Sequence, residues 1–163
     1  GSGLKYYYKD LEKPTRAETL NRVFLMGYRF DILGYKLNKD NPDMVYLRDL
    51  IALRQRIKGE LYRSSFKDEI GLGELPGNVH AKVFRHDEGK SVTVALLDRR
   101  EKKEALALSI NPADLRVGAL KKATLFTLDG QAVEMKIRPA AGGRWTAHVP
   151  ARQAVPAAVV FTP

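Results

Sequence analysis

Apolar and polar residues alternate with a period of two from residue 79 onward, and this pattern constrains the fold more than any other feature. Successive side chains of a β-strand point to opposite faces of a sheet, so alternation indicates strands with one buried face. The segments concerned are 79–83, 92–96, 106–110, 123–128, 133–137, 145–149 and 158–161. They predict an antiparallel β-sandwich of about seven short strands. Its two sheets should bury Val92, Val94, Leu106, Leu108 and Trp145 between them.

Turn residues separate these segments. Asp129-Gly130 and Gly142-Gly143 are typical of tight hairpins, because such turns need positive φ at their central positions. Asp87-Glu88-Gly89 and Asn111-Pro112 predict two further turns. The glycine- and proline-containing stretch 71–78 is the predicted hinge between the strands and the preceding residues.

The first half of the chain has helical rather than strand periodicity. Thr15 and Glu18 have the T-x-x-E spacing of a capping box, with Pro14 just before them, which predicts a helix starting there. Apolar residues and a glycine then recur at helical spacing: Leu20, Val23, Phe24, Gly27 and Phe30. The stretch 29–35 either finishes this helix or forms a short buried strand, and periodicity does not choose between them.

A second helix is marked more strongly at its start. Asn41 is a good N-cap residue, Pro42 suits the first helical position, and Asp43 is favoured at the positive end of the helix dipole. One apolar stripe is predicted to contain Leu47, Leu50, Ile51, Ile57 and Leu61. The opposite face is predicted to contain Arg48, Arg54, Gln55 and Lys58.

The two periodicities divide the chain into a helical segment, 1–70, and a C-terminal β-sandwich domain, 71–163. The expected fold class is therefore mostly β, with two α-helices before the sandwich. Two such helices cannot enclose a large core alone, so their apolar stripes must pack on the sandwich, on a second copy, or on the remainder of a parent protein. The opening Gly1-Ser2-Gly3 resembles a cut site or a cloning remnant, which suggests that a longer protein was trimmed.

Charge and composition exclude several classes of function. The net charge is +9, but it is spread evenly along the chain. Residues 1–70 contain 14 Lys and Arg and 10 Asp and Glu, and residues 71–163 contain 14 and 9. A specific nucleic-acid binder concentrates its basic residues on one surface. The even spread of charge along this chain therefore predicts no nucleic-acid partner. No apolar run approaches the ~20 residues needed to cross a bilayer. The sequence contains no Cys, which removes disulfides and thiolate chemistry, and we expect no cofactor.

Residues that could support catalysis or metal binding are scattered. His80, His86 and His148 do not have the spacing of a zinc site, and no metal site is predicted. Asp68 and Glu69 are adjacent, whereas glycoside hydrolysis needs two carboxyl groups facing each other across a cleft, so both should face solvent. Tyr6-Tyr7-Tyr8 could stack on a sugar or dock against the helices, and docking is favoured. Trp145 is expected in the core rather than on a sugar platform.

Three stretches together resemble the C-terminal region of a TIM-barrel glycoside hydrolase. Residues 18–34 look like the last helix-to-strand passage of such a barrel, and 46–56 resembles its final helix. The closing stretch, 144–150 and 158–161, is similar to the last strands of the β-sandwich that follows the barrel in these enzymes.

The resemblance implies that residues 29–33 form the last barrel strand, whose C-terminal end would face a substrate. Asp31 and Tyr35 are then the candidate sugar-binding residues, and no catalytic residue is assigned, because the acid and the nucleophile would lie on earlier strands. The expected function is an accessory portion of a carbohydrate-active enzyme, inactive alone and supporting the barrel. The alternative is an independent β-sandwich module that binds carbohydrate or protein.

Overall fold

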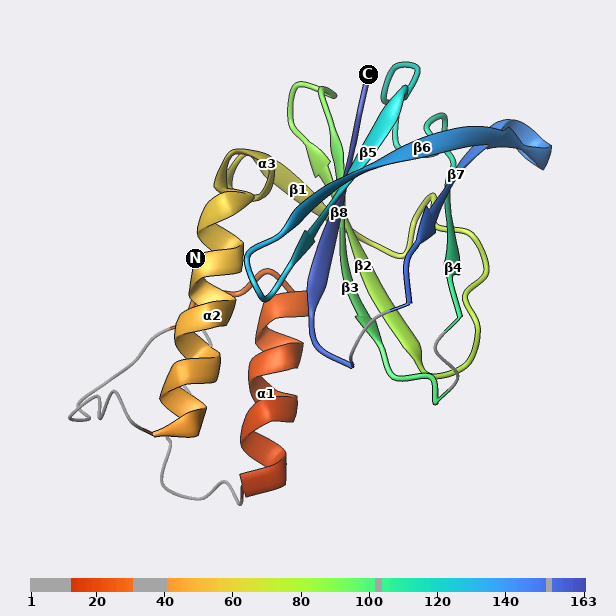
Figure 1. The fold of residues 1–163 in the computed structure, drawn as a ribbon. Coiled ribbons are helices and arrows are strands. Elements are labelled where there is room, and N and C mark those ends of the chain that lie inside the picture. Colours follow the sequence, from red (N-terminus) through yellow and green to blue (C-terminus); the bar gives the residue numbers. More distant parts are fainter. Residues whose placement is uncertain (1–12, 31–40, 102–103, 152–153) are drawn as a thin grey trace.

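The computed structural model describes residues 13–30, 41–101, 104–151 and 154–163 (Figure 1). The helices are α1 (Lys13–Leu25), α2 (Pro42–Arg56) and the short α3 (Lys58–Tyr62). The strands are β1 (Ser64–Asp68), β2 (Val79–His86), β3 (Val92–Asp98), β4 (Leu106–Ile110), β5 (Lys122–Thr127), β6 (Ala132–Ala140), β7 (Arg144–Val149) and β8 (Ala157–Thr162). A 3₁₀ turn, Ala141–Gly143, joins β6 to β7.

The strands are antiparallel, as predicted, but they form one curled sheet instead of two facing sheets. The order across the eight strands is β1-β2-β3-β8-β5-β6-β7-β4. The prediction of a seven-stranded sandwich is wrong because β6 is long: Ala132 to Lys136 pair with β5, and Ile137 to Ala140 pair with β7. Strand β6 therefore joins two groups of strands into one sheet, whereas the alternation of apolar and polar residues alone would place them in separate sheets.

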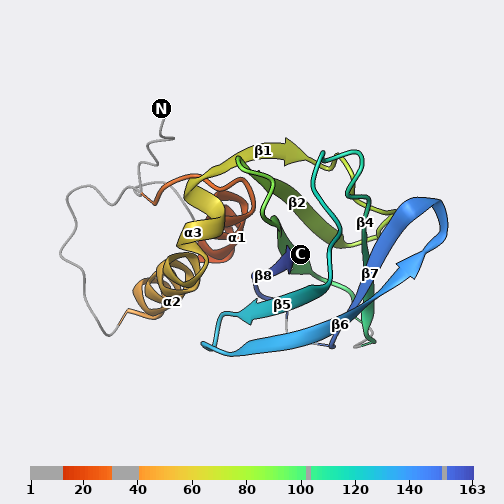
Figure 2. The same cartoon turned by 90° about the horizontal axis from the view of Figure 1, so that it is seen from above.

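The sheet curls until its far edge meets the segment that follows β1 (Figure 2). Leu72 forms an isolated bridge with Ile110 of β4. The amide of Asn111 donates to the carbonyl of Gly71 at 2.7 Å, and the amide of Gly73 donates to the carbonyl of Ser109 at 2.8 Å. This contact brings the two ends of the strand order together around an apolar interior.

Two apolar clusters use the two faces of this sheet. The inner cluster contains alternate residues of β2 to β8, among them Val83, Val94, Leu108 and Val159, all fully buried. Val92, Leu106 and Leu108 are buried as predicted, and Trp145 is half-buried against the same cluster. The outer cluster joins α1 and α2 to the outward-facing side chains of β2, β3 and β8. Strands β3 and β8 are therefore buried on both faces.

The start of α2 follows the predicted capping pattern. The side chain of Asn41 accepts a hydrogen bond from the amide of Asp43 at 3.0 Å, and Pro42 occupies the first turn. In α1 the helix already begins at Lys13, so Thr15 lies inside its first turn and the predicted start is two residues late. Residues 31–35, where a strand was the alternative to a helix end, lie outside the described residues.

The apolar face of α2 packs on the outer face of the sheet of the same chain. Leu47, Leu50, Leu53 and Ile57 are buried against residues such as Leu97 and Val160. Burial of each such side chain stabilises the fold by roughly 1.5–3 kcal/mol. No second chain is needed to remove this helix face from water. Association through the helices stays a prediction.

Arg54 was predicted to face away from the core, and this is wrong. It is 8% exposed, and its Nη1 and Nη2 donate to the carbonyls of Tyr28 and Gly27 in the segment after α1. The guanidinium also lies 5.9 Å from the ring centroid of Phe30 and 5.8 Å from that of Tyr62. Burial lowers the pKa of Arg54, and the two carbonyls provide partners for Nη1 and Nη2, whereas Nε is buried without a hydrogen-bond partner among the described residues.

Candidate functional site

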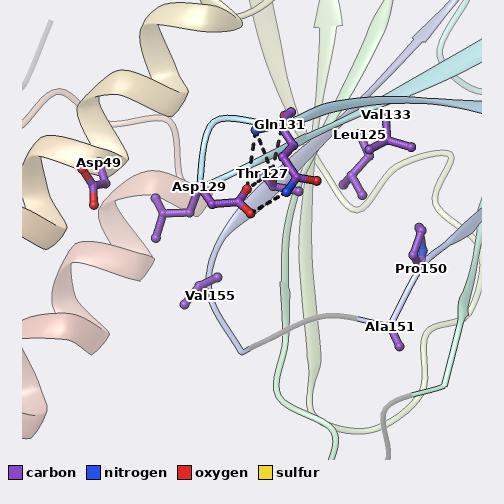
Figure 3. Close-up of a pocket in the computed structure, with 10 residues that line it drawn as sticks. Asp49, Leu125, Thr127, Asp129, Gln131, Val133, Pro150, Ala151 and Val155 are labelled. Carbon is purple, nitrogen blue, oxygen red and sulfur yellow. Dashed lines mark hydrogen bonds between the residues drawn. The ribbon is translucent and has the colours of Figure 1, made fainter.

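A groove of about 510 Å³ opens between α2, the β5–β6 hairpin and the connection from β7 to β8 (Figure 3). Its lining residues are Asp49, Leu125, Thr127, Leu128, Asp129, Gln131, Val133, Pro150, Ala151 and Val155. Figure 3 shows the hairpin on one side and Pro150, Ala151 and Val155 on the other. Its volume lies in the range of ligand-binding pockets, about 300–1,000 Å³.

The polar side of the groove is the turn predicted from Asp129-Gly130. The hydroxyl of Thr127 donates to Oδ1 of Asp129, and Nε2 of Gln131 donates to Oδ2 of the same carboxylate at 3.0 Å. The amide of Gln131 donates to Oγ1 of Thr127 at 3.2 Å. Gly130 has φ 90°, a left-handed conformation that favours glycine. The turn thus fixes the three polar side chains against one another.

Arg56 connects this turn to α2 through hydrogen bonds. Its Nη1 and Nη2 donate to the carbonyls of Thr127 and Gln131 at 3.3 and 2.6 Å, and its guanidinium lies 5.3 Å from the ring centroid of Phe126. The position of the groove wall therefore depends on the packing of the helix. The sequence pattern indicated the turn but not this clamp, because Arg56 and Gln131 are far apart along the chain.

Asp129 is unsuited to donate a proton. The hydroxyl of Thr127 holds its pKa below the usual value, with smaller contributions from backbone amides and from Arg56. A carboxyl group that is ionised at neutral pH cannot act as the general acid that glycoside hydrolysis needs. The other carboxylate of the lining, Asp49, is paired with Arg48 at 2.9 Å. The groove has one polar side in a mostly apolar lining, and its carboxylates are not arranged for acid–base catalysis.

The adjacent carboxylates Asp68 and Glu69 face solvent, as predicted. Both are bound by the same ammonium group, Nζ of Lys82, at 2.5 and 2.7 Å. The side chains of the two acids are 63% and 67% exposed, so this is a surface ion pair and not a cleft. A carboxylate pair shared by one lysine offers no free nucleophile.

The two nominated sugar-binding residues, Asp31 and Tyr35, lie outside the described residues, as do Tyr6, Tyr7 and Tyr8. His80 and His148 are exposed, and Nδ1 of His86 accepts a hydrogen bond from the amide of Glu88 at 3.2 Å. In the described ranges, no cluster of three or more His, Cys, Asp or Glu side chains could hold a metal ion. No helix among the same residues is long and apolar enough to span a membrane.

Comparison with known proteins defines no family for this chain. No family model matches it. No curated protein matches it either. Among solved structures, it is similar to alpha-L-fucosidase isoenzyme 2 from Paenibacillus thiaminolyticus, with 18% identity and a TM-score of 0.42. The match covers 77% of this chain and 18% of that chain, so this chain spans less than a fifth of the length of that protein.

Proposed function

We propose that this chain is a non-catalytic accessory module of a larger carbohydrate-active enzyme. The observation that carries the non-catalytic part is the shared core of helices and sheet: Leu50 of α2 and Ile57, which follows α2, are fully buried against the outer face of the strands. Such a unit keeps its shape without forming a catalytic cleft. The resemblance of 18–34, 46–56 and 144–161 to the end of a glycoside hydrolase supplies the carbohydrate context.

The chemistry of the described carboxyl groups supports the non-catalytic part of the proposal. Asp68 and Glu69 share Lys82, and Asp129 is held by Thr127 and Gln131. Glycoside hydrolysis needs one carboxyl group with a raised pKa and a second, ionised carboxyl group opposite it. The two described carboxyl groups whose pKa shifts, Glu88 and Asp129, both shift downward.

A second candidate function is an independent module that binds carbohydrate or protein. The same burial favours it, because α2 needs no barrel to cover Leu47, Leu50 and Leu53. The groove beside the β5–β6 hairpin provides a place for a small ligand. The two candidates differ in what precedes the chain in its gene.

Two measurements test the proposed function. The purified chain is expected to release no aryl group from a panel of aryl glycosides, and turnover that survives repurification would overturn the non-catalytic assignment. Sequencing the gene on the 5′ side of the codon for Gly1 is expected to show seven β/α units of a barrel. A stop codon or an unrelated domain at that place contradicts the accessory role and leaves the independent module.

A further inference from the structure

The outer face of the sheet beyond the helices is basic. In β5, β6 and β7, Ala123, Met135 and Ala147 point into the inner cluster, so their neighbours along each strand point outward. The outward residues include Lys122, Lys136, Arg138, Arg144 and His148, which we call the basic face. The three strands contain one acidic residue, Glu134.

The register brings like charges close together on this face. Lys122 and Lys136 are directly opposite each other in the β5–β6 ladder, which places their Cβ atoms about 5 Å apart. Arg138 follows Lys136 on the same face at about 7 Å, the repeat of alternate strand residues. Like charges directly opposite each other in a sheet are destabilising. A bound anion would relieve this repulsion, which is the first argument for a ligand here.

Neighbouring acids do little to neutralise the basic face. Glu134 lies 3.9 Å from Lys122, at the limit of an ion pair. Within the described part of the chain, no carboxylate is paired with Lys136, Arg138 or Arg144. Nη1 of Arg144 is buried and has no hydrogen-bond partner among the described residues. The exposed side chains of Lys136 and Arg138 therefore have donors free for an external anion.

Hydroxyl groups lie among these cations. Thr146 is opposite Arg138 in the β6–β7 ladder, and its Oγ1 is 2.6 Å from Oγ of Ser109 in β4. Thr162 is opposite Lys122, and its hydroxyl is buried without a hydrogen-bond partner among the described residues. The face thus combines fixed positive charges with neutral donors and acceptors, the two kinds of group that an acidic sugar chain needs.

We propose that the basic face binds an acidic polysaccharide, a sugar chain with repeated carboxylate or sulfate groups. The inference rests on the proposed function, because it names the substrate class that the accessory module would hold for its enzyme. Charge complementarity supplies the attraction, and the half-buried hydroxyl groups of Ser109 and Thr146 add neutral donors and acceptors beside Arg138. The site is separate from the groove beside the β5–β6 hairpin.

Two features favour a polysaccharide over nucleic acid. Binding of single strands relies on aromatic rings for base stacking, but Trp145 packs on the inner cluster and Phe126 packs in the cluster with the helices. The β6–β7 ribbon projects from the body in Figure 1, yet its tip is Ala140 to Gly143, which has no side-chain donor for base edges.

Affinity gel electrophoresis and titration calorimetry of the purified chain test this proposal. The probes are dextran sulfate, polygalacturonate, neutral dextran and duplex DNA, at low and at high salt. The face variant is Lys136→Glu with Arg138→Glu, and Lys136→Gln with Arg138→Gln provides a milder version. The matched control is Lys58→Glu with Arg63→Glu, which changes net charge equally but at exposed residues of the helical side. Circular dichroism confirms that each variant is folded.

The expected result is binding to dextran sulfate, polygalacturonate or both, no binding to neutral dextran, and loss of affinity at high salt. The face variants should bind about tenfold or more weakly, because they remove charge contacts, whereas the control should bind as the original chain does. Comparison of the two acidic probes separates sulfate from carboxylate preference. Absence of binding to both probes overturns the proposal, as does equal weakening by face and control variants. Tighter binding to DNA than to both polysaccharides also overturns the proposed polysaccharide site. That result would leave the proposed accessory role unaffected.

Discussion

The outer face of the sheet has two regions with opposite surroundings. Over β3 and β8 the helices cover it, and outward residues such as Thr93, Ala95, Leu97, Ala158 and Val160 are buried. Over β6 and the later part of β7 it is uncovered, because outward residues such as Lys136, Arg138 and His148 are exposed, whereas Arg144 at the start of β7 is half-buried. The same fold therefore contains strands apolar on both faces and strands apolar on one. The difference shows that the pattern of apolar and polar residues along a strand depends on what covers each face of the sheet, as well as on the strand conformation.

The largest loss of stability should come from a substitution in the region that the helices cover. Leu50→Ala removes a side chain that is 0% exposed beneath α2, and it is expected to lower the free energy of unfolding by about 2–5 kcal/mol. Val133→Ala, at a residue 37% exposed on β6, is the matched control and should cost less than about 1 kcal/mol. Urea denaturation followed by circular dichroism measures both. Equal losses would show that α2 is not docked on the sheet.

Two glycines test the comparison further, because they have nearly the same positive φ in different surroundings. Gly27 has φ 67° and Gly142 has φ 69°, but a Cβ atom at Gly27 would lie 2.6 Å from Cε1 of Phe84, while nothing lies within 4 Å at Gly142. Both Ala substitutions carry the strain of positive φ. Gly27→Ala should cost about 1–3 kcal/mol more than Gly142→Ala, because of overpacking in the covered region. Thermal unfolding of the two variants tests this difference, and similar melting temperatures would contradict it.

A smaller change in the free energy of unfolding is expected when the pH is raised, because a tyrosine of the covered region is buried. Tyr46 donates to Oδ1 of Asn21 at 2.5 Å between α2 and α1, and burial raises its pKa to about 12 from 10.0. The folded state therefore keeps this proton at a pH where the unfolded chain loses it. The resulting stability is present below pH 10 and is lost as pH rises toward about 12. Tyr46→Phe should weaken the decline of the unfolding free energy with pH in that window, and an unchanged decline would contradict the role of Tyr46.

The smallest effect belongs to the uncovered region. Lys136→Glu places an acid opposite Lys122, so repulsion becomes attraction, and stability should rise by a few tenths of a kcal/mol to about 1 kcal/mol. The gain should shrink in high salt, because exposed charges are screened. Thermal unfolding at two salt concentrations is the measurement. Lys58→Glu controls for the change in net charge.

Much of the secondary structure could be predicted, because it follows from local rules. Asn41 and Pro42 mark a helix start in any context, and Gly130 and Gly142 mark turns that need positive φ. The single curled sheet could not be predicted, since it depends on β6 pairing with different strands at its two ends. The short strand β1 also lacked a signal, because Ser64, Ser65, Lys67 and Asp68 leave almost no apolar alternation.

The candidate sites were harder to predict because they depend on contacts between distant residues. Counting charges along the chain gave an even spread, yet the β5–β6 and β6–β7 ladders gather Lys122, Lys136, Arg138 and Arg144 on one face. Arg54 was assigned to solvent from its helical position, and the carbonyls of Gly27 and Tyr28 that hold it lie on another element. The nominations of Asp31 and Tyr35 stay predictions.

The position of β8 has a consequence for how the protein is made. This strand is the last of the eight in the sequence, but it lies in the middle of the sheet, between β3 and β5. A ribosome synthesises β1 to β7 first, so in the nascent chain β3 and β5 lack their shared partner until Ala157 to Thr162 emerge, although residues 71–73 can already contact β4. Until then, the facing edges of β3 and β5 display unpaired backbone groups that can bind another strand. During synthesis, the centre of the finished sheet is therefore the part most exposed to aggregation and to chaperones.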